Sequence, residues 1–232
     1  MKLRRREDFD SDEIVAAVLP GIGSVVGLSG AALDPLTERF TGSGTATCPT
    51  GYNRCRIRLL GVGGGGGWRN NATVPAQSGA GGGYVEHIVT VAPGDQCSYS
   101  EGAPGAGATS AGNPGASGTA TRAGNVTATG GFTGTNLTAN GGGGGAATST
   151  GTSAGGTASG GNTTNTTGNS GTGGLSGLGG SGAGPYGGSG GNYTTLSNPP
   201  ANGGGGGWGG SNNEGAGGDG ATGVIEFYWY TV

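Results

Sequence analysis

The sequence predicts a mainly β protein with little regular secondary structure, in which a small antiparallel sheet or sandwich holds together a bundle of polyglycine rods. Three observations support this fold class. The chain has 63 glycines among its 232 residues, and pure five-glycine runs occupy 63–67, 141–145 and 203–207. Strand-like segments stand on both sides of the glycine-rich tract 102–223. Because glycine has no side chain to bury, this tract cannot build an ordinary apolar core.

The five-glycine runs can pack in a way that is closed to other residues. In the polyproline-II conformation the chain has three residues per turn and no internal hydrogen bonds, so five glycines form a rod of about 15 Å whose N–H and C=O groups need partners. Gly65, Gly143 and Gly205 lie at the centres of the runs and are the predicted scaffold residues. The composition is also typical of a flexible linker, but the clustering of glycines into pure runs favours rods.

Alternating polar and apolar residues predict the strands. Arg54, Arg56 and Arg58 alternate with apolar residues and should share one face of a strand, either as a solvated face or as a patch for an anionic ligand. An aromatic strand closes the chain at Val224–Tyr230. The remaining predicted strands are 84–91 and 96–101, with weaker ones at 125–129 and 135–139.

Residues 1–41 are predicted to be a separate attachment segment, and 42–232 the glycine-rich domain. A charged start is followed by 14–33, which carries no charge. This run is long enough for a membrane span, yet it contains Pro20 and several glycines. An acidic cluster before it is unlike a signal peptide. We therefore favour a short helix that ends at Pro20, followed by an apolar docking segment and a connector over 34–50.

No arrangement of residues typical of a known catalytic or metal site can be recognised in this sequence. His87 is the one histidine, and it falls on a predicted strand among apolar neighbours. The glycine runs lack the lysine of a phosphate loop. Glu214 and Asp219 could bind a cation, but we favour their interpretation as hydrated loop carboxylates. A net charge of −3 without a basic stripe argues against nucleic acid. We therefore expect no enzymatic activity, no cofactor, no metal and no nucleic-acid partner.

The chain has three cysteines. Cys48 and Cys55 flank a turn-like segment, so a disulfide across a hairpin is one hypothesis and free thiols are the other. No CxxC spacing is present to support zinc.

Four pieces of the chain, in order, resemble a known family. They are RIRLLGVGGGGG, GAGGGYVEHIVTVAPGDQCSYSEGAPGAG, NLTANGGGGG and GGDGATGVIEFYW. Over roughly residues 42–230 this order is similar to the glycine-rich domain of bacteriophage tail fibres and receptor-binding adhesins. The resemblance implies a virion protein, made in the host cytoplasm without a signal peptide, whose glycine-rich part displays loops for host attachment. The insert at 146–170 and the three cysteines depart from that pattern.

If the resemblance holds, the residues that contact the receptor are expected in the loops that join the rods. Aromatic and amide side chains suit surface glycans, outer-membrane proteins or pili, because they offer stacking faces and paired donors and acceptors. Trp68 and Trp208 each follow five glycines. For these two residues, a cap that covers the end of a rod is as good an interpretation as a receptor contact. The receptor-contact candidates are Trp68, Arg69, Asn70, Asn71, Tyr186, Tyr193 and Trp208.

Two other functions remain open from the sequence. One is a purely structural virion component, such as a head fibre, decoration spike or collar element. The other is a glycine-rich surface protein anchored in a membrane by 14–33. In the two virion functions, residues 1–41 are expected to bind other virion proteins.

The closing strand also leads to an expectation about assembly. Its alternation places Phe227 and Trp229 on one face together with Ile225. A domain rich in glycine has little apolar surface to cover both faces of this strand, so one face is expected to be exposed. Phe227 and Trp229 are therefore candidates for the interface of a homotrimer, the symmetry that the family resemblance implies.

Overall fold

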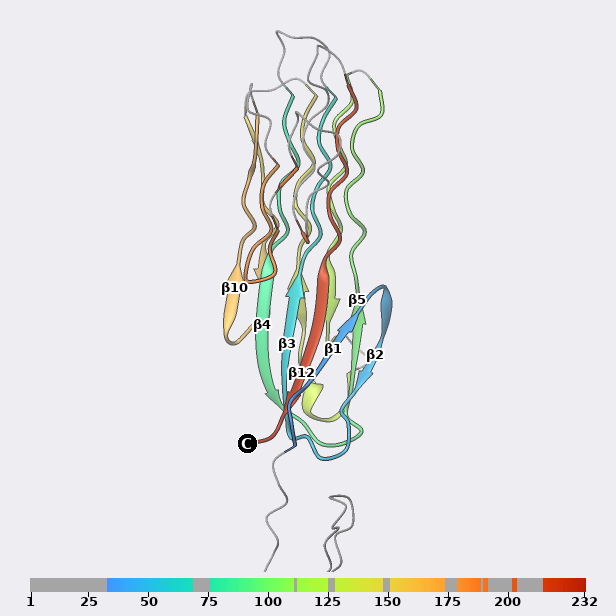
Figure 1. The fold of residues 1–232 in the computed structure, drawn as a ribbon, viewed down its shortest axis with the longest axis vertical. Coiled ribbons are helices and arrows are strands. Elements are labelled where there is room, and N and C mark those ends of the chain that lie inside the picture. The colour runs from blue at the N-terminus through green and yellow to red at the C-terminus, as the bar shows by residue number, and fades with distance from the viewer. Residues whose placement is uncertain are drawn as a thin grey trace, which may run out of the picture. The chain divides into compact units, whose positions relative to one another are not determined.

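The computed structural model describes residues 33–68, 76–110, 112–124, 128–147, 151–173, 179–188, 190–191, 202–203 and 215–232 (Figure 1). These residues form two five-stranded antiparallel sheets, with strand orders β1-β12-β3-β4-β10 and β2-β5-β6-β7-β9, and one two-stranded sheet, β8-β11. The mainly β fold class is confirmed. The elements are β1 (Leu36–Phe40), β2 (Ser43–Thr47), β3 (Arg54–Leu60), β4 (Tyr84–Thr90), β5 (Gln96–Ser100), β6 (Thr121–Ala123), η1 (Gly130–Phe132), β7 (Leu137–Ala139), β8 (Thr152–Ser153), β9 (Ala158–Ser159), β10 (Thr164–Thr166), β11 (Gly171–Thr172) and β12 (Val224–Tyr230).

The predicted strands form the centre of the first sheet. β3 pairs along its whole length with β12 on one side and with β4 on the other. Alternation in β3 turns Cys55, Ile57 and Leu59 into the core and leaves the arginines on the outer face. The predicted strand at 96–101 is β5, and the weak one at 135–139 is β7. Of the other weak strand, 125–127 lie outside the described residues.

The connector predicted over 34–50 is wrong, because it holds two strands. β1 pairs with β12, and β2 pairs with β5 in the other sheet. The side chains of β1 explain its place: Glu38 accepts a hydrogen bond from Trp229 Nε1 at 2.7 Å, and Phe40 stacks on Tyr99 with ring centroids 4.6 Å apart. The glycine-rich domain therefore begins before residue 42.

The chain divides into two compact units after Ala31, not after residue 41. The predicted helix and nearly all of the apolar run 14–33 lie outside the described residues. Within the part of the chain that the structure describes, no helix has the length and apolar character needed to cross a membrane.

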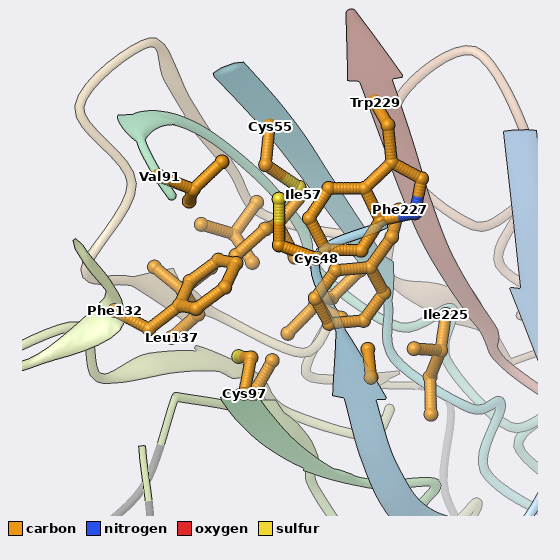
Figure 2. Packing of buried hydrophobic residues seen from close by; sticks show 14 of the residues in the cluster. Cys48, Cys55, Ile57, Val91, Cys97, Phe132, Leu137, Ile225, Phe227 and Trp229 are labelled. Carbon is orange, nitrogen blue, oxygen red and sulfur yellow. The ribbon is translucent and has the colours of Figure 1, made fainter. Parts of the chain in front are cut away.

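The apolar core lies between the two large sheets (Figure 2). Phe227 and Trp229 are fully buried in it and stack at 5.7 Å, and Phe132 meets both rings edge-on at 6.4 and 6.1 Å. The expectation that the Phe227 and Trp229 face of the closing strand is exposed is therefore wrong, whereas Tyr228 and Tyr230 on its other face stay partly exposed. The second sheet, which includes short strands from the glycine-rich tract, supplies the cover through residues such as Leu137. Neither Phe227 nor Trp229 is an interface residue.

The disulfide considered between Cys48 and Cys55 is not formed, and both are buried free thiols. The two residues do not face each other across a hairpin as expected. Cys48 follows β2 of the second sheet, whereas Cys55 lies in β3 of the first. The Sγ of Cys48 instead lies 3.6 Å from the carbonyl oxygen of Pro49 and 3.7 Å from that of Tyr52.

Beyond the sheets, glycine segments form a lattice of backbone hydrogen bonds. The rod that continues β3 shows the geometry best: the amides of its residues 61, 64 and 67 donate to the carbonyls of Gly83, Ala80 and Gln77 at 2.8–2.9 Å. One neighbour is met at every third residue, which is the repeat of a polyproline-II helix. The predicted hydrogen bonding between glycine segments is therefore confirmed for the described rods.

The same rod bonds to neighbours on its other sides. Its amides 63 and 66 donate to Ala221 and Gly218, and its carbonyls 62 and 65 accept from Gly142 and Gly145. All of 61–67 is buried. A Cβ on the scaffold residue Gly65 would lie on the carbonyl of Ala106. Gly143 is also part of the lattice, whereas Gly205 lies outside the described residues.

The rods extend from one end of the sheets, and the chain enters and leaves this unit at the other end (Figure 1). The hydroxyl of Tyr52 donates to the carbonyl of Asp34 at 2.7 Å, and the side chain of Asn53 donates to the carbonyl of Val232 at 3.3 Å. The turn at 52–53 therefore holds the first described residues close to the C-terminus.

Candidate functional site at the rod tips

The far ends of the rods are joined to one another by backbone hydrogen bonds. Trp68 donates its backbone amide to Asn113 at 3.1 Å, and Gln77 donates to Ala146 at 2.9 Å. Gln77 also forms a β-bridge with Gly173. Gly173 in turn donates to Gly151 at 3.0 Å. We call Trp68, Gln77, Asn113, Ala146, Gly151 and Gly173 the rod-tip cluster.

The members of the rod-tip cluster flank four different connections. These connections are 69–75, 111, 148–150 and 174–178, and they lie outside the described residues. Hydrogen bonds hold described residues on both sides of 69–75, 111 and 148–150 within one end of the lattice, and they hold Gly173 on one side of 174–178. The architecture therefore brings together segments that are far apart in the sequence, as a display surface requires.

Trp68 ends the rod that continues β3. Its side chain is partly buried, and its buried Nε1 has no hydrogen-bond acceptor in the part of the chain that the structure describes. A buried indole N–H normally finds a partner, since leaving it unpaired costs about 1–3 kcal/mol. This environment agrees with a cap on the rod end and leaves one donor available for an acceptor.

The described surface of the rod tips offers neutral polar groups. Ser110, Asn113 and Thr152 are exposed, and the Asn113 side chain donates to the hydroxyl of Ser110 at 2.6 Å. No charged residue belongs to the rod-tip cluster or to this set. Recognition by these residues would therefore rely on hydroxyl and amide hydrogen bonds.

The structure does not gather all the receptor-contact candidates at the tips. Arg69, Asn70, Asn71, Tyr193 and Trp208 lie outside the described residues. Tyr186 is described, and it lies at the opposite end of the rods from Trp68, against the outer face of the first sheet. Its location follows from the turn at Gly184–Gly187, where the amide of Gly187 bonds to the carbonyl of Gly184 at 3.1 Å.

Tyr186 belongs to a cluster that the sequence analysis missed. We call Arg39, Arg58, Glu86, Tyr186 and Glu226 the outer-face clasp. Arg58 donates to Glu86 at 2.8 Å, to Glu226 at 3.1 Å and to the Tyr186 hydroxyl at 2.7 Å. The Tyr186 hydroxyl donates to Glu226 at 2.7 Å, and Arg39 donates to Glu226 at 2.9 Å. The Tyr186 ring also lies under the guanidinium of Arg39, 4.9 Å from its centroid.

The electrostatics of the outer-face clasp identify it as a structural anchor. Glu226 is almost fully buried, which raises the pKa of its carboxyl, but hydrogen bonds from Tyr186, Arg39 and Arg58 hold the pKa below its usual value. Burial lowers the pKa of Arg58, yet its hydrogen bonds to Glu86 and Glu226 leave that pKa raised. Every charge is paired, so the clasp fastens the turn around Tyr186 to the sheet. Charged residues on neighbouring strands, Arg58 opposite Glu226 and Glu86, were the available signal.

No group of three His, Cys, Asp or Glu side chains in the described residues is arranged to hold a metal ion. His87 faces the interior of the sandwich, and burial lowers its pKa. Its Nδ1 is buried, and no described residue forms a hydrogen bond with it. The structure thus places this histidine on a strand face, away from the rod tips.

Comparison with known proteins identifies the family of the whole domain but no individual relative. A search of curated proteins found no match to this chain. A family model described as a glycine-rich domain matches residues 38–230. That range contains β2 to β12, the last three residues of β1 and all the described rods. The chain therefore belongs to this glycine-rich domain family.

Proposed function

We propose that this protein is a bacteriophage virion component, a tail fibre or tail-tip protein that displays loops on a rigid glycine scaffold for attachment to the host cell. The observation that supports this most is the rod-tip cluster, in which hydrogen bonds hold residues beside four connections at one end of the domain. The chain enters and leaves the domain at the other end. A protein that holds a particle at one end and a receptor at the other needs this separation.

The lattice gives a physical reason for this function. Interlocking amide and carbonyl partners restrain each rod from several sides, so loop ends are positioned before a receptor arrives. Preorganisation of this kind reduces the ordering entropy lost on binding. The neutral amides and hydroxyls at the tips suit a glycan or the loops of an outer-membrane protein. The candidates Trp68, Arg69, Asn70, Asn71 and Trp208 supply the aromatic and amide groups in this proposal.

Competition for adsorption tests the proposal. Purified protein should block attachment of the phage, and Thr152→Arg, at the exposed surface of the rod tips, should weaken the block at least tenfold. Thr45→Arg is the matched control, because Thr45 is also an exposed strand threonine but lies in β2 of the second sheet. A protein that is present in the virion yet blocks nothing would instead be a purely structural component. Equal effects of the two substitutions would place receptor contact away from the tips.

The proposal includes attachment and assembly. Residues 1–41 bind other virion proteins, and the protein acts as a homotrimer in the virion, as the family resemblance implies. Since Phe227 and Trp229 are core residues, a trimer must use another surface. Light scattering on the purified full chain measures the oligomeric state, and a monomer that nevertheless blocks adsorption would remove the trimer from the proposal.

A further inference from the structure

The outer face of the first sheet carries a second group of arginines, which lies farther from the rods than the outer-face clasp. Arg54 lies opposite Tyr230 and Arg56 opposite Tyr228 in the register of β3 and β12. Their sequence neighbours on both strands point into the core, so these four side chains share the outer face. All four remain partly exposed. We call Arg54, Arg56, Tyr228 and Tyr230 the arginine–tyrosine patch.

The two arginines of the patch lack the carboxylates that neutralise the clasp. Arg39 and Arg58 both form ion pairs at 2.8–3.1 Å, whereas no carboxylate among the described residues lies within ion-pair distance of Arg54 or Arg56. The Nε of Arg56 is buried and has no hydrogen-bond partner among the described residues. Its guanidinium lies 5.6 Å from the centroid of the Tyr228 ring, a contact that leaves its N–H groups unused. Within the described residues, the patch therefore combines two partly exposed arginines that have no carboxylate partner.

The spacing of the patch limits the shape of its ligand. Arg54 and Arg56 are two residues apart on one strand, so their Cα atoms are about 7 Å apart. Carboxylates on alternate residues of an extended peptide have the same spacing and point to the same side. The rings of Tyr228 and Tyr230 are 5.7 Å apart and form an apolar wall along one side of the arginine row. Ile88, opposite Arg56 on β4, stands on the other side.

We propose that the arginine–tyrosine patch binds an acidic peptide segment of a partner protein, in an extended conformation with carboxylates on alternate residues. Guanidinium–carboxylate pairing supplies the affinity, and the two-residue repeat of the strand supplies the selectivity. The patch lies at the end of the domain where the chain enters and leaves, which suits contact with a neighbouring protein. The inference stands on the patch alone and does not depend on a role in a virion.

Titration of labelled synthetic peptides into the full-length protein tests the proposal. The first peptide alternates five Asp with Ser, the second has the same composition with the five Asp in one block, and the third replaces Asp with Asn. The alternating peptide should bind at least five times more tightly than the block peptide, with affinity that falls as salt is added. The Asn peptide should not bind. Arg54→Gln combined with Arg56→Gln should weaken binding of the alternating peptide at least tenfold.

A matched variant and two competitors complete the experiment. Arg122→Gln removes an exposed arginine of β6 in the other sheet and should leave binding unchanged. Circular dichroism checks that the double variant keeps its fold. Unchanged binding by the double variant, or equal binding of block and alternating peptides, would overturn the proposal. Displacement of the peptide by a sulfated polysaccharide or by millimolar phosphate at equal charge concentration would also overturn it, since either shows a general anion site.

Discussion

The backbone amide of Gly65 donates to the carbonyl of Ala116 at 2.9 Å, while the space beside its Cα is filled by the carbonyl of Ala106. Two separate segments of the chain therefore touch one glycine at once. Contacts of this kind replace side-chain packing in the lattice, and they leave no room for a Cβ. The core of the rod bundle is built from backbone atoms. The positions of the glycines therefore determine which segments can pack against one another.

Substitution of Gly65 by valine should prevent stable folding or cost at least about 3 kcal/mol, because the branched side chain forces rods apart and leaves buried amides unpaired. Urea denaturation measures the loss. Gly143→Val should cost less, because a Cβ on Gly143 would lie 3.0 Å from its nearest neighbour, the Ala154 carbonyl oxygen. Ala116→Val is the control, since Ala116 is exposed on a rod. Equal losses at Gly65 and Ala116 would argue against a tightly packed lattice.

A pair of truncations should separate the attachment segment from the folded domain. A protein lacking residues 1–31 should keep the melting temperature of the full chain, because the boundary between the two compact units falls between Ala31 and Ala32. A protein lacking residues 1–41 loses β1, which removes Glu38 from Trp229 and Phe40 from Tyr99. Its melting temperature should fall by at least about 5 °C. If both truncated proteins melt alike, β1 does not contribute to the sheet.

The shorter truncation also tests the proposed role of the first residues. A protein lacking 1–31 should remain soluble and folded but should no longer be incorporated into particles. Incorporation at the normal level would show that the folded domain, and not residues 1–31, attaches the protein to the particle.

Tyr186→Phe should destabilise the protein by about 1.5–3 kcal/mol, because it removes a hydroxyl that bonds to two charged groups, Arg58 and Glu226. The change leaves the ring and its contact with Arg39 in place. Tyr230→Phe is the matched control, since the structure shows no hydrogen bond from that hydroxyl among the described residues. Adsorption by Tyr186→Phe should change only as far as stability changes. If the variant is as stable as the unmodified protein but no longer supports adsorption, Tyr186 contacts the receptor directly.

The sequence predicted the parts of the fold that follow from local pattern. Polar–apolar alternation marked β3, strand-favouring residues marked β4, and an aromatic run marked β12, while the pure glycine runs indicated rods that bond to one another. It did not predict β1 and β2, because Leu36–Phe40 and Ser43–Thr47 gain their stability from distant partners and not from their own composition. The same holds for β6 and η1, which cover Phe227 and Trp229 from within the glycine-rich tract.

The candidate site was predictable only in part. The position of Trp68 at a rod end followed from the five glycines before it. The partners of that end did not, because Asn113, Ala146 and Gly173 meet through the register of separate rods, and glycine segments without side chains carry no local signal of register. The location of Tyr186 at the sheet end of the rods could not be predicted for the same reason, because it depends on which way the rod before Gly184 runs.

The free thiols predict a loss of stability in alkaline solution. Burial raises the pKa of Cys97 from 9.0 to about 12, and burial raises that of Cys55 as well. Burial and the neighbouring Glu86 raise the pKa of the Tyr84 hydroxyl. A raised pKa in the folded state means that the unfolded chain releases its proton first. The stabilisation is therefore complete below pH 9 and is lost as pH rises from there toward the folded pKa values.

The free energy of unfolding, measured by urea denaturation in the presence of a reductant, should fall steadily above pH 9. Each buried thiol contributes about 1.4 kcal/mol per pH unit in the range between its two pKa values. Cys97→Ala should therefore lower the slope by the equivalent of one proton, whatever it does to the stability at pH 7. Arg122→Gln, which changes an exposed and permanently charged group, should leave the slope as it is. A slope that does not change in Cys97→Ala would mean that this thiol ionises in the folded protein, and that the space between the two sheets admits water at Cys97.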